Sequence, residues 1–570
     1  MMKIKDIKTF LLAGVVCLSF AATLSSCESE LDEVPDNRTE IDTPEKVQLL
    51  MVSAYPQATP AVMCELFGDN YVDNNVVRAN AGLHRAPNQE FHSEAYAWKD
   101  VTNYSTSTND TPYQTWEQYY QGIAVCNHAI EAMRNMSANP ATDPNLSHSW
   151  GEAHVLRAYL HFVLVNVFAE AYKDDTQSAA DRGIPYVTKP ETTVSVNYST
   201  SEFLHSVKET YDLIEKDMLE GMSLIDDSKY KVPAYHMNKN ACYAFATRFY
   251  LYKRDYDKVI QYADNALGSN ASSSMRKWAS MNTNTINSML NSYNDEKAPC
   301  NYLLQTAYSV QDRLVTNLRF VINQGNANEG VKSSYNALYG SGPNWLNRLR
   351  AYNGKLFIST AGSQEDGSFL FRVIEYFEYT DKIAGIGYVH MIYQPFTAEE
   401  TLLCRAEAKL YKGDQAGAID DLNTWTASKL VSDPLTLAKI KNFYSSSKTP
   451  AQIASDDYIS ELHPAEMSPQ FKVLTGDDLS VLYCILHFRR IETMFEGLRW
   501  FDIKRYGILV RHVYRGPTDA APTADELKWN DKRRVIQIPN NVINAGYPST
   551  DRSTSINQST PLTQQPILAK

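Results

Sequence analysis

Two segments of the chain share one helical design. Residues 240–267 read NACYAFATRFYLYKRDYDKVIQYADNAL, and residues 399–425 read EETLLCRAEAKLYKGDQAGAIDDLNTW. In both, apolar and small side chains recur at helical spacing, stop at a short charged turn and then resume. The turns fall at 253–255 and 412–414. A helix with such an apolar face must bury it against another element, so the pattern predicts helical hairpins in a mostly α fold.

Three more segments have the periodicity of long helices, and long irregular stretches separate the elements. The expected helices are residues 116–133, 152–168 and 203–219. The irregular stretches lie at about 68–112, 268–300, 325–370 and 426–475, and are rich in Asn, Ser, Thr, Gly and Tyr. Long loops inside a compact chain are usually functional or disordered. The hairpins resemble tetratricopeptide repeats, but they are not contiguous, so a simple solenoid is not expected.

The first residues are typical of an export signal. Three lysines precede an apolar stretch at residues 10–20, which is too short to span a bilayer. Residues 24–27 (LSSC) then look like a bacterial lipobox, in which the cysteine is lipidated and becomes the mature N-terminus. The alternative is an ordinary secretory signal with a chance cysteine. The resulting division is 1–26 as signal peptide, 27–44 as a lipidated acidic linker and 45–570 as one domain.

Charge and motifs argue against several functions. The formal net charge is −12, whereas a nucleic-acid-binding protein needs a basic surface to neutralise phosphates, so no nucleic-acid partner is expected. The sequence has no HExxH, GxSxG or P-loop pattern, and its twelve histidines are scattered. We therefore expect no catalytic residue, no metal site and no cofactor. A glycosidase needs only two carboxylates, so the residues alone leave hydrolysis open.

The segment 488–507 (FRRIETMFEGLRWFDIKRYG) resembles the signature of the SusD/RagB family. The matching residues are Arg489, Arg490, Glu492, Glu496, Gly497, Arg499, Asp502, Arg505 and Gly507. Phe488 stands where the family usually has Glu, a departure that would remove one structural ion pair. Further matches are Glu400, Ala406–Ala408, the stretch 413–419, the helix 151–162 and the tail 538–547. The resemblance covers nearly the whole mature chain, and the irregular stretches match least.

The resemblance implies both a fold and a function. The fold would be mostly α, SusD-like, with tetratricopeptide-like hairpins and an irregular, loop-rich ligand-binding part. The function would be non-enzymatic capture of a nutrient, with an oligosaccharide or polysaccharide as the expected ligand, at the outer face of the outer membrane. The partner would be a SusC-like TonB-dependent transporter. The alternatives are a surface glycoside hydrolase, a peptide-binding RagB-like lipoprotein and a scaffold that binds only proteins.

The charged signature also has a meaning of its own. Glu496, Arg499, Asp502 and Arg505 follow one another at steps of three, which on a single helix gives a ladder of alternating charge. We interpret this ladder as structural rather than catalytic. Gly497 falls inside the expected helix, where it costs about 1 kcal/mol relative to Ala. We therefore predict that Gly497 is a close-packing site against another helix.

Aromatic residues are the most direct candidates for ligand contact. The chain has 36 Tyr, 20 Phe and 8 Trp, and sugars present flat C–H faces that stack on aromatic rings. Trp98, Trp345 and Trp278 lie in irregular, polar stretches. The hypothesis is that at least one of them stacks on ligand. The alternative for each is a small apolar core beneath a loop.

The lipobox assignment predicts that Cys27 carries the membrane anchor. Cys27→Ala should release the protein from membrane fractions, because several acyl chains on one cysteine provide the stable attachment. Fractionation followed by a salt wash measures this. If the variant stays with the membrane after the wash, the anchor lies elsewhere in the chain.

Overall fold

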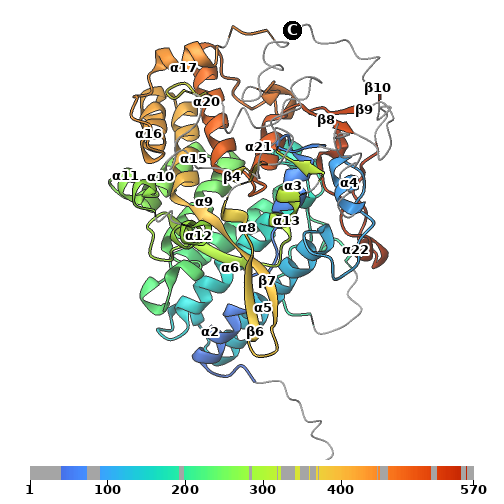
Figure 1. Ribbon diagram of the computed structural model, residues 1–570. Helices are drawn as coiled ribbons and strands as arrows, with labels where there is room; N and C mark the ends of the chain where they lie inside the picture. The colour runs from blue at the N-terminus through green and yellow to red at the C-terminus, as the bar shows by residue number, and fades with distance from the viewer. Residues whose placement is uncertain are drawn as a thin grey trace, which may run out of the picture.

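A computed structural model describes most of the chain after its N-terminal segment (Figure 1). The described residues are 40–73, 90–191, 198–281, 285–317, 319–322, 341–346, 358–359, 368–369, 371–445, 447–449, 460–514, 523–553 and 560–561. Cys27 lies outside these residues, so the lipid anchor stays a prediction. Within them, no helix is long and apolar enough to cross a membrane.

The described chain is mostly helical, with short strands, as the sequence predicted. The helices are α2 (Pro44–Val52), α3 (Ala61–Phe67), α4 (Glu90–Tyr96), α5 (Pro112–Met136), α6 (Ser147–Phe168), α7 (Asp175–Ala180), α8 (Val207–Met222), α9 (Lys239–Lys253), α10 (Tyr256–Leu267), α11 (Ala271–Ser274), α12 (Ile286–Tyr293), α13 (Gln311–Asn317), α15 (Ala398–Tyr411), α16 (Gln415–Ser428), α17 (Leu437–Phe443), α19 (Pro464–Met467), α20 (Gly476–Glu492), α21 (Leu498–Tyr506) and α22 (Asn540–Asn544). The strands are β1 (Val72–Asp73), β2 (Asn301–Ala307), β3 (Phe320–Val321), β4 (Ile358–Ser359), β5 (Ser368–Phe369), β6 (Tyr376–Asp381), β7 (Ile386–Thr397), β8 (Val510–Tyr514), β9 (Thr523–Leu527) and β10 (Thr560–Pro561).

Both predicted hairpins are confirmed, as α9–α10 and α15–α16. Each turn uses a residue in the left-handed region, Arg254 at φ 64° in the first and Gly413 at φ 86° in the second. An aspartate then caps the second helix, as Asp414 does by accepting a hydrogen bond from the Gly417 N–H. Tyr256 of α10 stacks on Tyr411 of α15 with ring centroids 4.6 Å apart. The two hairpins therefore pack side by side although about 130 residues separate them.

The strands form small antiparallel sheets. β2, β7 and β6 make a three-stranded sheet in the order β2–β7–β6, and β8, β9 and β10 make another. β2 pairs with the second half of β7, from Met391 to Thr397, whereas β6 pairs with the first half. The β6–β7 ribbon therefore extends beyond the three-stranded region. Figure 1 shows it reaching the lower end of the molecule, with the hairpins at the upper left and β8–β9 at the right.

A buried ionic network joins four helices at the centre of the helical half. Its members are Arg248, Arg489, Arg505, Glu400, Glu407 and Asp502, three arginines facing three carboxylates. Arg489 is fully buried and lies 3.1 Å from Asp502 and 3.5 Å from Glu400. Burial alone would raise the pKa of Asp502, but Arg489 and Arg505 lower it below its usual value. The three positive and three negative charges balance inside the core. Removing any one of them would leave a buried charge without its partner, so the network stabilises the fold only when it is complete.

The other signature residues also reach outside their own segment. Arg499 binds both carboxylate oxygens of Asp69, at 3.0 and 2.7 Å, and Arg490 donates to the Asn70 side chain at 2.9 Å. Two further pairs are Glu492 with Lys429 at 2.7 Å and Glu496 with Arg372 at 3.0 Å. These contacts support the structural interpretation of the signature.

The expected single-helix ladder is wrong in one respect. α20 ends at Glu492 and α21 begins at Leu498, so Glu496 precedes the helix and Gly497 is its N-cap. Gly497 has φ 75°, a conformation that residues with a Cβ rarely adopt, and this makes a continuous helix impossible here. Within α21, the pair Asp502–Arg505 keeps the predicted spacing, at 2.7 Å.

Phe488 replaces a charge by an apolar contact. Its side chain is fully buried and stacks on the Trp425 ring, with centroids 4.6 Å apart and planes inclined by 24°. The cysteines of the described residues pack as small buried hydrophobes. All are buried and free within the described residues: Cys64, Cys126, Cys242, Cys300, Cys404 and Cys484.

The close packing expected at Gly497 is confirmed and gives a stability prediction. A Cβ there would lie 2.8 Å from Cys64 Cβ and 2.9 Å from Ala61 Cα, in addition to the backbone strain. Gly497→Ala should therefore lower the free energy of unfolding by about 2–5 kcal/mol, the sum of left-handed strain and overpacking.

Gly413 supplies the matched control. It also has a positive φ, but a Cβ there would meet no atom within 4 Å. Gly413→Ala should cost only the strain, about 1–2 kcal/mol. Chemical denaturation of both variants measures the difference, and equal losses would show that α21 does not pack closely on α3.

Candidate functional site

The three tryptophans proposed to stack on ligand are all buried. Trp98, Trp278 and Trp345 expose only 1%, 4% and 8% of their surface. Trp98 donates its Nε1–H to the Phe67 carbonyl at 2.9 Å and stacks on His512, and Trp345 lies 5.5 Å from the Phe488 ring. The stacking hypothesis is therefore wrong for these rings. They anchor the irregular stretches to the core, which was the alternative interpretation.

An aromatic groove of about 560 Å³ lies elsewhere, beside α5. Its walls come from α5, from residues 185–191 with Tyr198, and from α22 with the residues that follow it. The lining residues are Trp116, Glu117, Tyr120, Gln121, Ile123, Ala124, His128, Pro185, Val187, Lys189, Glu191, Tyr198, Asn541, Val542, Ala545 and Tyr547. This volume is in the range of small-molecule binding sites.

Helix α5 forms one wall because it is amphipathic. The exposed positions Glu117, Gln121, Ala124 and His128 follow one another at steps of three or four, so they form one stripe along the helix. Trp116 and Ile123 point into the core. Thr111 caps the start of the helix by accepting a hydrogen bond from the Gln114 N–H.

Aromatic rings line the floor of the groove. Trp116 lies 4.8 Å from Tyr120 and 6.3 Å from Tyr547, centroid to centroid. Tyr120 is half-buried and donates its hydroxyl to the Pro185 carbonyl at 2.8 Å. These contacts fix the orientation of the rings, so part of the Tyr120 face stays available to a ligand.

The opposite wall carries the polar groups. The Tyr198 hydroxyl donates to the Glu191 carboxylate, and partial burial raises the pKa of Glu191 above its usual value. Lys189 is exposed. The Ser199 hydroxyl donates to the Gly546 carbonyl, which joins this wall to the end of α22. Residues that are about 350 positions apart in the sequence therefore meet at the groove.

A buried polar network holds the segment 185–189 in place behind the groove. Arg157 binds both carboxylate oxygens of Asp217, at 2.7 and 2.8 Å, and the Tyr186 hydroxyl donates to the same carboxylate at 2.6 Å. Arg157 also donates to the Asn127 side-chain oxygen at 2.7 Å, and Asn127 in turn donates to the Val187 carbonyl at 3.1 Å. This series of hydrogen bonds runs from α8 through α6 to α5, and it fixes the position of the groove wall at residues 185–189.

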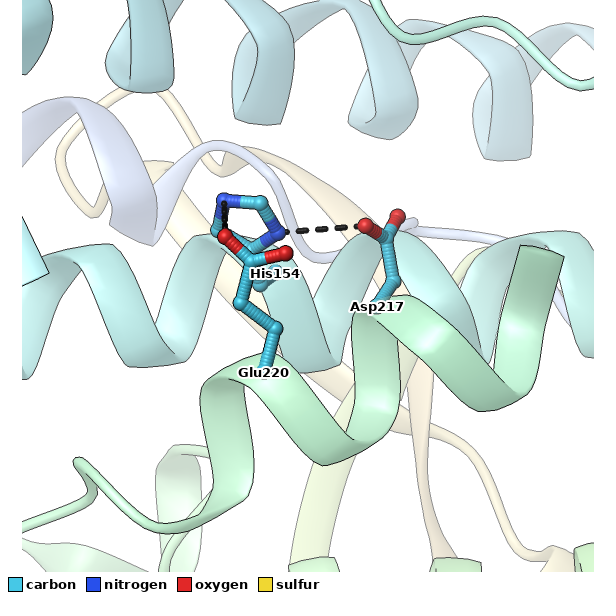
Figure 2. A group of neighbouring side chains, drawn as sticks. All are labelled: His154, Asp217 and Glu220. Atoms are coloured by element: carbon cyan, nitrogen blue, oxygen red, sulfur yellow. Dashed lines mark hydrogen bonds and ion pairs between the residues drawn. The ribbon is translucent and has the colours of Figure 1, made fainter.

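His154, Asp217 and Glu220 lie close enough to suggest a metal site, but their geometry disfavours one. Figure 2 shows the His154 ring between the two carboxylates. Nδ1 faces Asp217 at 3.1 Å and Nε2 faces Glu220 at 3.6 Å, so the two carboxylates approach different nitrogens of one ring. Burial alone would raise the pKa of Asp217, but hydrogen bonds from His154 and Arg157 hold it well below its usual range. Since Asp217 already binds Arg157, we interpret the cluster as support for the groove wall.

Comparison with known proteins finds SusD-like relatives. A family described as starch-binding and associating with the outer membrane matches residues 30–251. A SusD-like protein of Formosa agariphila is 23% identical over 548 residues, which are 92% of this chain and 96% of that protein. These matches agree with the signature at 488–507. The chain is similar to SusD-like proteins over nearly all of its length.

Solved structures agree on the SusD-like fold. A SusD superfamily protein of Bacteroides fragilis has a TM-score of 0.56 at 16% identity, covering 89% of this chain and 99% of that one. A SusD-like carbohydrate-binding protein of Bacteroides vulgatus has a TM-score of 0.54 at 14% identity, covering 88% of this chain and 96% of that one. At these identities the structures establish the fold alone.

Sequence reasoning missed the groove of this SusD-like chain. In the sequence, Tyr120 is marked only by the predicted helix 116–133, and Tyr547 only by the tail 538–547. Tyr198 carried no signal of its own. The polar stripe on α5 was the one available clue, because exposed positions at helical spacing on an otherwise buried helix mark a solvent-facing surface.

The support network gives a stability prediction. Asp217→Ala leaves the Arg157 guanidinium buried without its carboxylate, so the free energy of unfolding should fall by about 3–5 kcal/mol. Asp212→Ala on the same helix is the matched control. Asp212 pairs with Lys208 at 2.6 Å, but its side chain is 45% exposed, and such pairs contribute about 1 kcal/mol or less. Thermal or chemical denaturation measures both. If both variants lose the same small amount, Asp217 does not hold the groove wall.

Proposed function

We propose that this chain is a lipid-anchored protein of the outer membrane that captures a glycan and delivers it to a SusC-like TonB-dependent transporter. The observation that carries the proposal is the groove, whose lining combines aromatic rings with polar side chains. The family match and the lipobox at Cys27 support the location.

The chemistry of the groove suits a sugar. Tyr120 offers part of a ring face, and ring faces stack on the flat C–H faces of pyranoses. Glu117, Gln121 and Lys189 are exposed beside it and offer hydrogen-bond donors and acceptors for hydroxyl groups. Ligand sites of this size combine an apolar surface with a few polar groups in the same way.

Known relatives support a carbohydrate ligand. The matching family is described as starch-binding, and one of the similar solved structures is described as a SusD-like carbohydrate-binding protein. Both descriptions name binding. We therefore place binding ahead of hydrolysis for this chain, and the sequence contains no standard hydrolase motif.

A transporter partner is proposed because an anchored binding protein needs a second protein to carry its ligand across the membrane. Binding at a surface does not move a ligand across a membrane, and no helix in the described residues is suited to span one. A tether raises the effective concentration of two membrane-bound partners, so even a modest interface would stay engaged. We expect that interface on the helical hairpins, which leaves the loops and the groove to the ligand.

A substitution that fills the groove tests the binding site. Ala124 is exposed on α5 and lines the groove. Ala124→Trp should reduce glycan affinity by about tenfold or more while leaving the melting temperature unchanged, because the new ring occupies the ligand space and not the core. Affinity electrophoresis across a panel of polysaccharides measures binding.

Ala416→Trp is the matched control. Ala416 is exposed on α16, outside the groove, so the same change should leave binding intact. If wild type binds a glycan and both variants bind it equally well, the ligand site lies elsewhere.

Two further measurements separate the rival functions. Incubation with oligosaccharides should leave their chain lengths unchanged, whereas shortened products would identify a hydrolase. A pull-down from detergent-solubilised outer membrane should recover a β-barrel transporter together with this chain. Binding of peptides but not of any polysaccharide would favour the RagB-like alternative, and binding of neither would favour a protein scaffold.

A further inference from the structure

The β6–β7 ribbon exposes large apolar side chains at one end of the molecule. Phe377, Tyr379 and Ile386 expose 48%, 52% and 61% of their surface, and Ile383 in the connecting turn is fully exposed. The turn itself is well defined. Asp381 accepts hydrogen bonds from the Ile383 and Ala384 N–H groups at 2.8 and 3.0 Å. Reversing the chain does not require an exposed isoleucine, so this ordered turn indicates an interaction surface.

The ribbon has two different faces. Phe377 and Tyr379 occupy alternate positions of β6, so they share one face, and their rings lie 4.8 Å apart. Glu378 lies on the other face, opposite Tyr388 in the strand register, and 3.8 Å from the His390 ring. Phe377 and Tyr379 therefore make one exposed face apolar. The other face is mixed, because Glu378 and His390 share it with Tyr388 and Ile386.

The ribbon lies at the end of the molecule where the described chain begins. The Gln57 carbonyl, shortly after α2, accepts a hydrogen bond from the Tyr308 N–H at 3.0 Å, and the Tyr308 ring lies 5.2 Å from Tyr388 of β7. Helix α2 adds two exposed apolar side chains, Leu49 and Val52. Figure 1 shows α2 and the ribbon together at the lower end.

From these observations we propose that the apolar face and tip of the β6–β7 ribbon insert into the interface of the membrane to which the chain is tethered. This proposal rests on the lipid anchor of the proposed function. Only 12 residues lie between Cys27 and Glu40, so these two residues are at most about 45 Å apart when the segment is fully extended. The ribbon is therefore held within reach of the bilayer.

The chemistry of the ribbon favours a bilayer over the other possible occupants. Phe, Tyr and Ile are residue types that partition to the membrane interface. A stable protein interface buries about 800 Å² on each partner, more than one face of a narrow two-stranded ribbon can offer. The segment 28–39, which follows Cys27, is rich in acidic residues. Charged side chains would not pack well on an apolar face, so this segment is not the expected occupant.

An environment-sensitive probe on the tip tests the proposal in the full-length lipidated protein. Ile383→Cys can be labelled with nitrobenzoxadiazole selectively, because the native cysteines of the described residues are buried. The control is Val473→Cys, an exposed site beside the start of α20. That start pairs with α17 through Lys441 and Asp477, and Figure 1 shows α17 at the upper end.

The labelled proteins are reconstituted into phosphatidylcholine vesicles and separated by flotation. At residue 383 the emission should shift to the blue, quenching by spin-labelled acyl chains should be strong and iodide quenching weak. At residue 473 the emission should not shift, quenching by spin-labelled acyl chains should be weak and iodide quenching strong. Labelled variants with wild-type melting temperatures exclude misfolding as the cause.

Three outcomes contradict the proposal and can be told apart. If the protein floats with the vesicles but residue 383 stays accessible to iodide, the ribbon does not insert and the anchor stands. If residue 383 becomes shielded only after a transporter is added, the ribbon contacts protein instead. If the protein does not float at all, the anchor is wrong, and the proposal that rests on it is wrong as well. Glycan binding is measured separately and does not affect these results.

Discussion

Three arginines and three carboxylates buried among α9, α15, α20 and α21 set the geometry on which the helical half depends. Arg489 is fully buried at the centre, and Arg505 binds Glu407 at 2.8 Å and Asp502 at 2.7 Å. Removing charges from water is costly, and only complete pairing offsets that cost. Each helix must therefore sit where its charged group finds its partner. This ties the two helical hairpins to the signature segment more specifically than apolar contacts alone would.

The same physical solution recurs behind the groove. Arg157 and Asp217 form a buried pair with two hydrogen bonds, and Tyr186 completes it. Here the pair joins helices to an irregular segment, and so converts a loop into a rigid wall. A binding surface on loops needs such support, because loops pack less tightly than helices and lose more freedom when a ligand orders them. The contacts with the helical core therefore hold this wall of the groove in place.

The sequence predicted what depends on local periodicity. The hairpins at 240–267 and 399–425 appear with nearly the predicted bounds, because small apolar residues at helical spacing define the buried face. The structural interpretation of the signature residues agrees with their buried ion pairs. Their partners were not predictable, since Asp69 and Lys429 lie far away in sequence. Gly497 misled the helix prediction, because spacing alone does not reveal a left-handed backbone. The tryptophans were misplaced for a related reason. A polar loop can hold its own apolar anchor, and burial depends on contacts such as that of Trp98 with His512.

Hydrogen–deuterium exchange of the native protein with and without a bound glycan tests the central claim most directly. That claim is that the ligand occupies the groove between α5, the segment 185–191 and α22. Residues 188–191 and 540–546 are exposed or partly exposed, so a ligand there should slow the exchange of their backbone amides. The account predicts slower exchange in both segments and little change in α15 and α16. Slower exchange confined to other parts of the chain, with both groove segments unchanged, would contradict it.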